Sequence, residues 1–110
     1  IMYDYGISIH LFLGTPFFES MYYDKPCILI FEKKMHLNFD KKFLSILKKL
    51  KDNNICFNNA YEASKFLNKN SNNIYKWWDN KKLKKIKKEF CNIYCNNFNS
   101  DKDVFKKLFN

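Results

Sequence analysis

The chain has 110 residues, the size of one domain, and 46% of them are hydrophobic. This composition supports a buried core and excludes a disordered tail. The formal charge is +9, but all twenty basic residues are lysine. Arginine makes the bidentate contacts to phosphate and guanine, so its absence argues against a specific nucleic-acid partner. We interpret the lysine excess as a solvated surface and keep polyanion binding as the alternative.

The sequence offers no pattern for a metal site, a cofactor or a membrane span. Its four cysteines form no C-x-x-C pair, and His10 and His36 are not at ligand spacing, so we expect no metal and buried free thiols. Neither histidine has a spacing that nominates it as a catalytic base, and His10 is interpreted as structural. The longest mainly apolar stretch, residues 7–18, is shorter than the ~20 residues of a membrane-spanning helix. The start of the chain does not have the pattern of a signal peptide.

The first predicted elements are a strand end and a short helix. Residues 1–5 are typical of the middle or end of a strand, as if the chain were part of something longer, and the apolar segment from Gly6 to Leu13 receives no assignment. In Gly14-Thr15-Pro16, threonine suits the N-cap and proline the first helical position. A helix is therefore predicted from Pro16 to about Tyr23.

The middle of the chain alternates strands with helices. The continuous apolar run from Cys27 to Phe31 predicts a strand that is buried on both faces. Apolar residues then recur at helical spacing from Asp40 to Lys51, and Asp40 suits the N-cap. Residues 55–57 predict a second short strand, followed by a helix capped by Asn58 or Asn59. Such alternation indicates the α/β class.

The rest of the chain, after the polar break 68–73, is predicted to be helical. A long helix is expected from about Asn80 to Asn97, and a last turn or two at residues 101–109. We therefore predict a single partial domain, with an α/β part at 1–73 and a helical C-terminal extension at 74–110. Of Trp77 and Trp78, one is expected to pack inward and the other to cover a seam or a partner domain, with sugar stacking as the alternative.

Only the start of the first helix has the pattern of a ligand site. In open α/β folds, ligands lie outside the carboxyl ends of the strands, and phosphates favour helix N-termini. Gly14 would let a ligand approach the backbone, Thr15 would add a hydroxyl, and Glu19 can accept both hydroxyls of a ribose. The alternative is that Thr15 is only a cap and that the dipole favours a negative charge at Glu19.

The residues around this segment also resemble a known family. Asp4-Tyr5, the stretch Gly14-Thr15-Pro16-Phe17-Phe18-Glu19-Ser20 and the Pro26-led strand are similar to a G-T-x-x-x-E…P stretch near the nucleotide site of glycosyltransferases with two Rossmann domains (GT-B). The similarity is greatest to transferases encoded in bacterial surface-polysaccharide and lipopolysaccharide gene clusters. Members continue to a paired tryptophan and a helix with a phenylalanine, and Trp77-Trp78 and Phe90 have these positions.

The resemblance implies a fold and a function. The fold is an incomplete Rossmann-like parallel sheet, the C-terminal half of a GT-B-type donor domain, with a helical tail. The function is nucleotide-sugar-dependent transfer in lipopolysaccharide or O-antigen biosynthesis, with a nucleotide-activated donor bound by Gly14, Thr15, Glu19 and Asp4. The missing N-terminal domain would supply the acceptor site and the catalytic base, so the chain alone is expected to be catalytically incomplete.

A lysine-rich segment is relevant to where the protein is located in the cell. Lys81 to Lys88 place a basic face around an apolar stripe, which suits solvent or an anionic membrane. We expect a cytoplasmic protein, with peripheral contact at the inner face of the cytoplasmic membrane as one possibility. Two alternatives to the transferase stay open: a small basic module that binds nucleic acid or another polyanion, and a nonfunctional remnant of a split gene with open sheet edges.

Overall fold

The computed structural model describes residues 6–32 and 39–95, which form an α/β fold around a three-stranded parallel sheet. The strands are β1 (Ser8–His10), β2 (Cys27–Ile30) and β3 (Cys56–Phe57), in the order β1-β2-β3. In this register Ile9 lies opposite Ile28, and Leu29 opposite Cys56. The predicted α/β class is confirmed, and the arrangement is consistent with an incomplete Rossmann-like fold.

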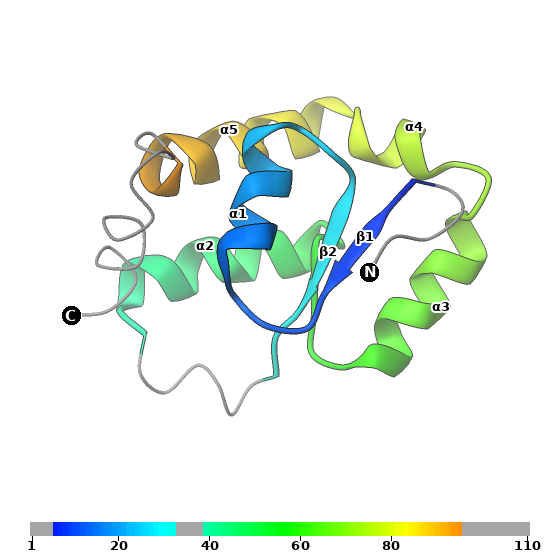
Figure 1. The fold of residues 1–110 in the computed structure, drawn as a ribbon, viewed down its shortest axis with the longest axis horizontal. Coiled ribbons are helices and arrows are strands. Elements are labelled where there is room, and N and C mark those ends of the chain that lie inside the picture. The colour runs from blue at the N-terminus through cyan, green and yellow to red at the C-terminus, as the bar shows by residue number, and fades with distance from the viewer. Residues whose placement is uncertain (1–5, 33–38, 96–110) are drawn as a thin grey trace.

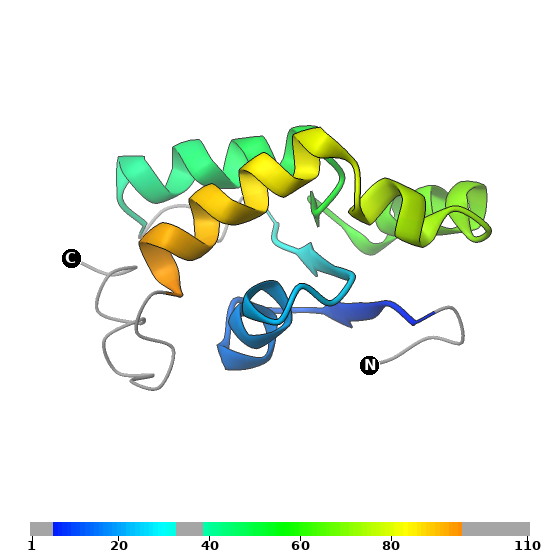
Figure 2. The same ribbon diagram turned by 90° about the horizontal axis from the view of Figure 1, so that it is seen from above.

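Helices cover both faces of this sheet. They are α1 (Thr15–Tyr22), α2 (Lys41–Asp52), α3 (Ala60–Asn70), α4 (Ile74–Trp78) and α5 (Lys81–Tyr94). Figure 1 shows α1 and α2 on one side of the strands and α3 on the other. Figure 2 shows α5 lying across α2, and α5 also contacts α1 and α4. The three helices α1, α2 and α5 therefore form one layer, and α3 belongs to the opposite layer.

The central strand β2 divides the core in two. Its Cys27 and Leu29 side chains enter the larger core, together with buried residues of α1, α2 and α5. Ile28 and Ile30 point the other way, into a smaller core with residues of α3. All four residues of β2 are buried, as the continuous apolar run predicted, because a parallel strand with helices on both faces has no polar side.

Side-chain caps set the starts of three helices. Asp40 accepts a hydrogen bond from the Phe43 backbone N–H at 2.7 Å, and Asn59 accepts one from Glu62 at 2.8 Å. Asn80 does the same for α5, at 3.0 Å from the Leu83 N–H. Each such cap stabilises its helix by about 1 kcal/mol. The predicted caps at Asp40 and Asn59 are confirmed.

Four details differ from the sequence predictions. The unassigned segment 6–13 contains β1, and α3 extends to Asn70, into the predicted polar break. The N-cap of α1 is Gly14 instead of Thr15, which is already the first helical residue and makes no side-chain cap. The long helix α5 ends at Tyr94, and the predicted elements at 1–5 and 101–109 lie outside the described residues.

The paired tryptophans are both structural. Trp78 is buried and its Nε1 donates to Asp24, to the carbonyl at 3.2 Å and to Oδ1 at 2.9 Å. Trp77 is half-buried and its Nε1 donates to the Asn53 carbonyl at 3.1 Å. This confirms that one tryptophan packs inward, while the other covers the seam between α4 and the end of α2.

Lys87 departs from the predicted basic face of α5. Only 5% of this residue is exposed, whereas the other lysines of α5 are exposed. Its Nζ donates to Asp24 Oδ1 at 2.8 Å and to the Trp78 carbonyl at 2.7 Å. The interpretation of Lys81 to Lys88 as a continuous outer face is therefore wrong at Lys87, because tertiary partners satisfy its ammonium inside the fold.

None of the helices in residues 6–32 and 39–95 has the length and apolarity needed to cross a membrane. The four cysteines are free thiols, as expected, and Cys27, Cys56 and Cys95 are buried. Burial raises the pKa of the Cys56 thiol to about 12.

Candidate functional site

The start of α1 lies at the edge of the sheet where ligands bind in open α/β folds. β1 ends at His10, and residues 11–14 lead directly into α1 (Figure 1). Because this connection is short, the carboxyl end of β1 and the first turn of α1 are at the same edge of the sheet. This is the edge where the general rule for α/β folds places the ligand.

A hollow of about 410 Å³ lies between β1 and α1, and we call it the β1–α1 groove. Strand, helix and following turn all contribute to its lining, which consists of Ser8, His10, Pro16, Glu19, Ser20, Tyr23, Lys25 and Pro26. Glu19 and Lys25 are exposed there, and neither forms an ion pair with any described residue. The groove therefore offers one free carboxylate and one free ammonium to a ligand.

His10 joins two hydroxyl groups in this groove. Its Nε2 lies 3.0 Å from Ser8 Oγ and 3.4 Å from Ser20 Oγ. The imidazole ring also makes an edge contact with the Phe17 ring, with centroids 5.8 Å apart. Burial lowers the pKa of His10 below its usual 6.5, so the imidazole is neutral at neutral pH.

The structure brings one predicted site residue into the groove and leaves others beside it. Glu19 lines the groove, while Gly14, the N-cap of α1, and Thr15, its first helical residue, do not line it. Asp4 lies outside the described residues. Ser8, His10 and Lys25 were not predicted as site residues. The available signal was the alternation Ile7-Ser8-Ile9-His10, which places Ser8 and His10 on the same face of a strand.

Gly14 has a structural explanation of its own. Its φ of −153° is extended backbone that any residue adopts. A Cβ at this position would lie 2.8 Å from Cε2 of the Phe12 ring, which covers the residue. A glycine here therefore accommodates Phe12, and close approach of a phosphate is a second role that remains a prediction.

The N-terminal end of α1 offers few free backbone N–H donors to a phosphate. Pro16 has no N–H, and the N–H groups of Phe17 and Phe18 both donate to the Gly14 carbonyl, at 3.0 and 3.3 Å. Thr15 is thus the first helical residue with an N–H to offer, together with its hydroxyl. An anion at this helix end would depend on Thr15.

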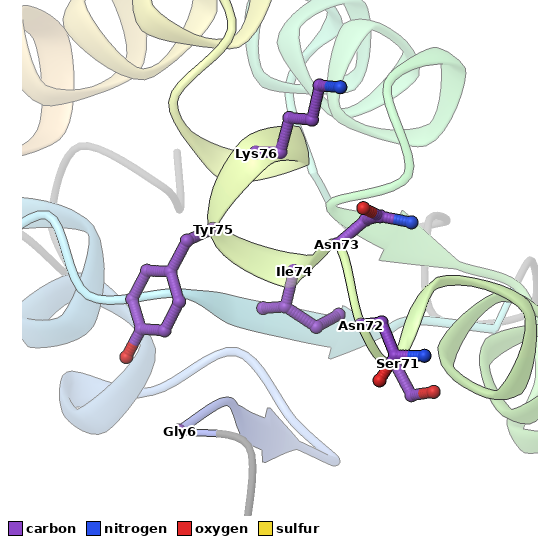
Figure 3. A pocket seen from close by; sticks show the side chains of 7 residues that line it. All are labelled: Gly6, Ser71, Asn72, Asn73, Ile74, Tyr75 and Lys76. Carbon is purple, nitrogen blue, oxygen red and sulfur yellow. The ribbon is translucent and has the colours of Figure 1, made fainter.

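A second hollow, of about 400 Å³, lies where α3 meets α4 (Figure 3). It is lined by Gly6 and by residues 71–76, and Tyr75 extends toward Gly6 in this view. Gly6 precedes β1, so this hollow is at the amino end of that strand. The lining of the β1–α1 groove extends from Ser8, at the amino end of β1, to His10 and Pro16 at the carboxyl end. Because it reaches the edge where ligands of open α/β folds lie, this groove is the better candidate site.

Comparison with known proteins identifies the protein family and its general type of enzyme. The family model of the LIC12162 family transferase matches residues 7–109, which include every described helix and strand. The chain belongs to this transferase family. The prediction of a transferase is confirmed at this level. No curated protein and no solved structure matches the chain.

The LIC12162 family match places the β1–α1 groove within the shared region. Among residues 6–32 and 39–95, no three His, Cys, Asp or Glu side chains gather in a way that could hold a metal ion. The polar groups of the groove are therefore a carboxylate, an ammonium, an imidazole and hydroxyls. Such a set can make hydrogen bonds with ligand hydroxyls and can attract an anionic group.

Proposed function

We propose that this LIC12162 family member contributes the donor-nucleotide site of a nucleotide-sugar-dependent glycosyltransferase of GT-B architecture. The observation that carries the proposal is Glu19, an exposed carboxylate in the β1–α1 groove with no ion-pair partner among the described residues. A carboxylate has two acceptor oxygens, which suit the two neighbouring hydroxyls of a ribose. In this proposal the Glu19 carboxylate orients the nucleoside of the activated donor.

The topology of the sheet supports this assignment. In a doubly wound domain, the ligand lies where the strand order reverses, between the two halves of the sheet. The described sheet has the order β1-β2-β3, so β1 is one of its two outer strands, and it is the one that carries the groove. If this sheet is one half of a donor domain, β1 is the strand that adjoins the other half.

Thr15 completes the proposed nucleotide site. It is partly exposed at the first position of α1, where its N–H and hydroxyl can donate to a phosphate oxygen. Gly14 precedes it, and the Phe12 ring that covers Gly14 is 65% exposed. In this proposal the phosphate at the helix end is bound by Thr15.

The proposed reaction needs a second domain and an acceptor. We assign the acceptor site and the catalytic base to an N-terminal domain, which would meet this chain beside the groove. The exposed side chains of Leu11 and Phe12 lie there, at 57% and 65%. Synthesis of lipopolysaccharide or O-antigen uses lipid-linked acceptors at the inner face of the cytoplasmic membrane, and the exposed lysines of α5 give a basic surface toward anionic lipid.

Calorimetric titration with UDP, GDP and CMP at two salt concentrations tests the nucleotide site. We expect one nucleotide to bind selectively, to survive the higher salt and to lose most of its affinity in Glu19→Ala. Glu62→Ala is the matched control, since Glu62 is an exposed carboxylate in the first turn of α3. Binding that salt abolishes and that is indifferent to nucleotide and to Glu19 would instead favour the polyanion-binding module.

A further inference from the structure

The positive charge of the described residues is concentrated on two helices. Together, α2 and α5 contain eleven lysines and two carboxylates, Asp52 and Glu89, which gives them a net charge of +9. The other residues of 6–32 and 39–95 contain four lysines and six carboxylates, a net charge of −2. A lysine-rich composition alone would spread the charge over all the helices, so composition does not explain this segregation.

The exposed sides of α2 and α5 join into one surface. The two helices contact each other, and Figure 2 shows α5 lying across α2. Where they meet, Lys49 Nζ lies 2.7 Å from Glu89 Oε1, and both side chains are partly exposed. This ion pair joins the two helices at the surface and neutralises the one carboxylate of α5. The lysines at 41–49 are exposed, as are those at 81–88 apart from Lys87, and we call this surface the α2–α5 face.

The α2–α5 face is basic without being apolar. Six large hydrophobic side chains are exposed among the described residues, and none of them belongs to α2 or α5. Proteins that bind single-stranded nucleic acid use exposed aromatic rings on which the bases stack. The described part of this face has no such rings, so its attraction to a partner is electrostatic.

The width of the face favours a membrane over a nucleic-acid duplex. Two packed helices lie about 8–10 Å apart and each is about 10 Å across, so together they are roughly 20 Å wide. The major groove of DNA is about 12 Å wide and admits a single helix. An anionic bilayer is an extended surface, on which the lysines of both helices can lie near the headgroups at the same time.

We infer that the α2–α5 face adsorbs on an anionic lipid bilayer through lysines of both helices, with α3 in the opposite layer directed away from the membrane. The negative headgroups attract the ammonium groups, and no exposed large hydrophobic side chain of the described helices α2 and α5 inserts between the lipids. A role of this contact in reaching lipid-linked acceptors rests on the proposed function. The affinity for anionic lipid rests on the charge distribution alone.

Sedimentation of the full chain with lipid vesicles tests the face. We expect binding to vesicles of about one-third phosphatidylglycerol in phosphatidylcholine, none to phosphatidylcholine alone, and release at about 0.5 M salt, where charges are screened. Lys41→Gln/Lys48→Gln removes two charges from α2, and Lys82→Gln/Lys85→Gln removes two from α5. Each double variant is expected to weaken partitioning about thirtyfold, because one lysine near an anionic membrane contributes about fivefold.

Lys65→Gln/Lys69→Gln is the matched control, since it removes the same charge from exposed positions on α3. We expect it to change partitioning by less than threefold. Equal weakening by all three double variants would overturn the face and show that net charge alone determines binding. Weakening by the α5 variant but not by the α2 variant would also overturn it, because α2 would then make no contact. Circular dichroism of each variant confirms that it is folded.

Duplex DNA, added as a competitor at equal phosphate concentration, decides between the two polyanions. Retention of the chain on the vesicles would support the membrane as partner, whereas its displacement by the duplex would overturn that assignment.

Glu19→Ala separates the face from the proposed function. It should weaken nucleotide binding without weakening vesicle binding, since Glu19 lies on α1. Vesicle binding that requires the α2 and α5 lysines, in a chain that binds no nucleotide, would retain the face and refute the donor-nucleotide site. Nucleotide binding that requires Glu19, in a chain that ignores anionic vesicles, would do the opposite.

Discussion

The ammonium nitrogen of Lys87 lies 4.0 Å from the centre of the Trp78 ring and donates to the Trp78 carbonyl at 2.7 Å. Asp24 Oδ1 accepts from both residues, from Lys87 Nζ at 2.8 Å and from Trp78 Nε1 at 2.9 Å. Asp24 belongs to the turn after α1, so this cluster joins α1, α4 and α5. It holds the end of α1, and with it the β1–α1 groove, against α4 and α5.

The two charged members of this cluster are expected to differ in their effect on stability. Asp24 has a 61% exposed side chain, so water solvates its carboxylate when Lys87→Met removes the partner, and we expect a loss of about 1–2 kcal/mol. Asp24→Asn leaves the buried ammonium without a counter-charge, and we expect the free energy of unfolding to fall by about 2–3 kcal/mol. Asparagine tolerates the positive φ of 56° at this position.

Urea unfolding of the three proteins measures these free energies. Lys85→Met provides the control, since removal of an exposed lysine from the same helix should change stability by less than about 0.5 kcal/mol. A larger loss for Lys87→Met than for Asp24→Asn would contradict the expected order.

Gly6 is constrained by its backbone and by Tyr75. Its φ is +76°, and a Cβ there would lie 2.6 Å from the Tyr75 hydroxyl oxygen (Figure 3). We expect Gly6→Ala to lower the free energy of unfolding by about 1–2 kcal/mol. Alanine disfavours this backbone conformation, and its Cβ would also clash with the Tyr75 hydroxyl. Thermal unfolding of Gly6→Ala in the wild-type and Tyr75→Phe backgrounds separates the two causes. Relief of the whole cost by Tyr75→Phe would show that the backbone conformation contributes nothing.

The local patterns of the sequence predicted most of the fold. The apolar run of β2 and the caps at Asp40 and Asn59 depend on neighbours within a few residues, and all three are confirmed. β1 was missed because its polar residues line the groove on one face, so the segment looked like an interrupted apolar run. An outer strand with one apolar face has a weaker signal than a strand buried on both sides.

Long-range contacts explain what the sequence could not predict. Lys87 is buried because Asp24, 63 residues earlier, reaches it, and no pattern within α5 indicates this. The groove also depends on contacts between segments that are separate in the sequence. Glu19 was predicted from its place in the first turn, whereas Ser8 and Lys25 become site residues only when β1, α1 and the following turn come together.

The thiol of Cys91 is expected to be the most reactive of the four cysteines. A hydrogen bond from Cys95 lowers the pKa of Cys91, while burial raises those of Cys27 and Cys56. Because the thiolate is the reactive form, iodoacetamide should modify Cys91 first at pH 7.5, and Cys95→Ala should slow that reaction severalfold. Mass spectrometry of the native protein identifies the modified site. Faster modification of buried Cys56 would contradict the expected order.

His10 is expected to make the stability of the protein depend on pH. Burial lowers its pKa in the folded chain, so the unfolded chain binds the proton more readily as the pH falls through 6.5. The free energy of unfolding should therefore decrease between pH 7 and pH 5, and it should level off once the pH is below the folded pKa. The charged groups that line the groove with His10 are Glu19 and Lys25.

His10→Gln isolates this contribution, because glutamine does not titrate while the rest of the chain stays the same. The difference in unfolding free energy between wild type and variant, measured in urea at half-unit intervals from pH 5 to 7, should shrink as the pH falls. A constant difference would mean that His10 has the same pKa folded and unfolded. It would also mean that the polar surroundings of the ring, with Ser8 and Ser20 as partners, offset its burial in full.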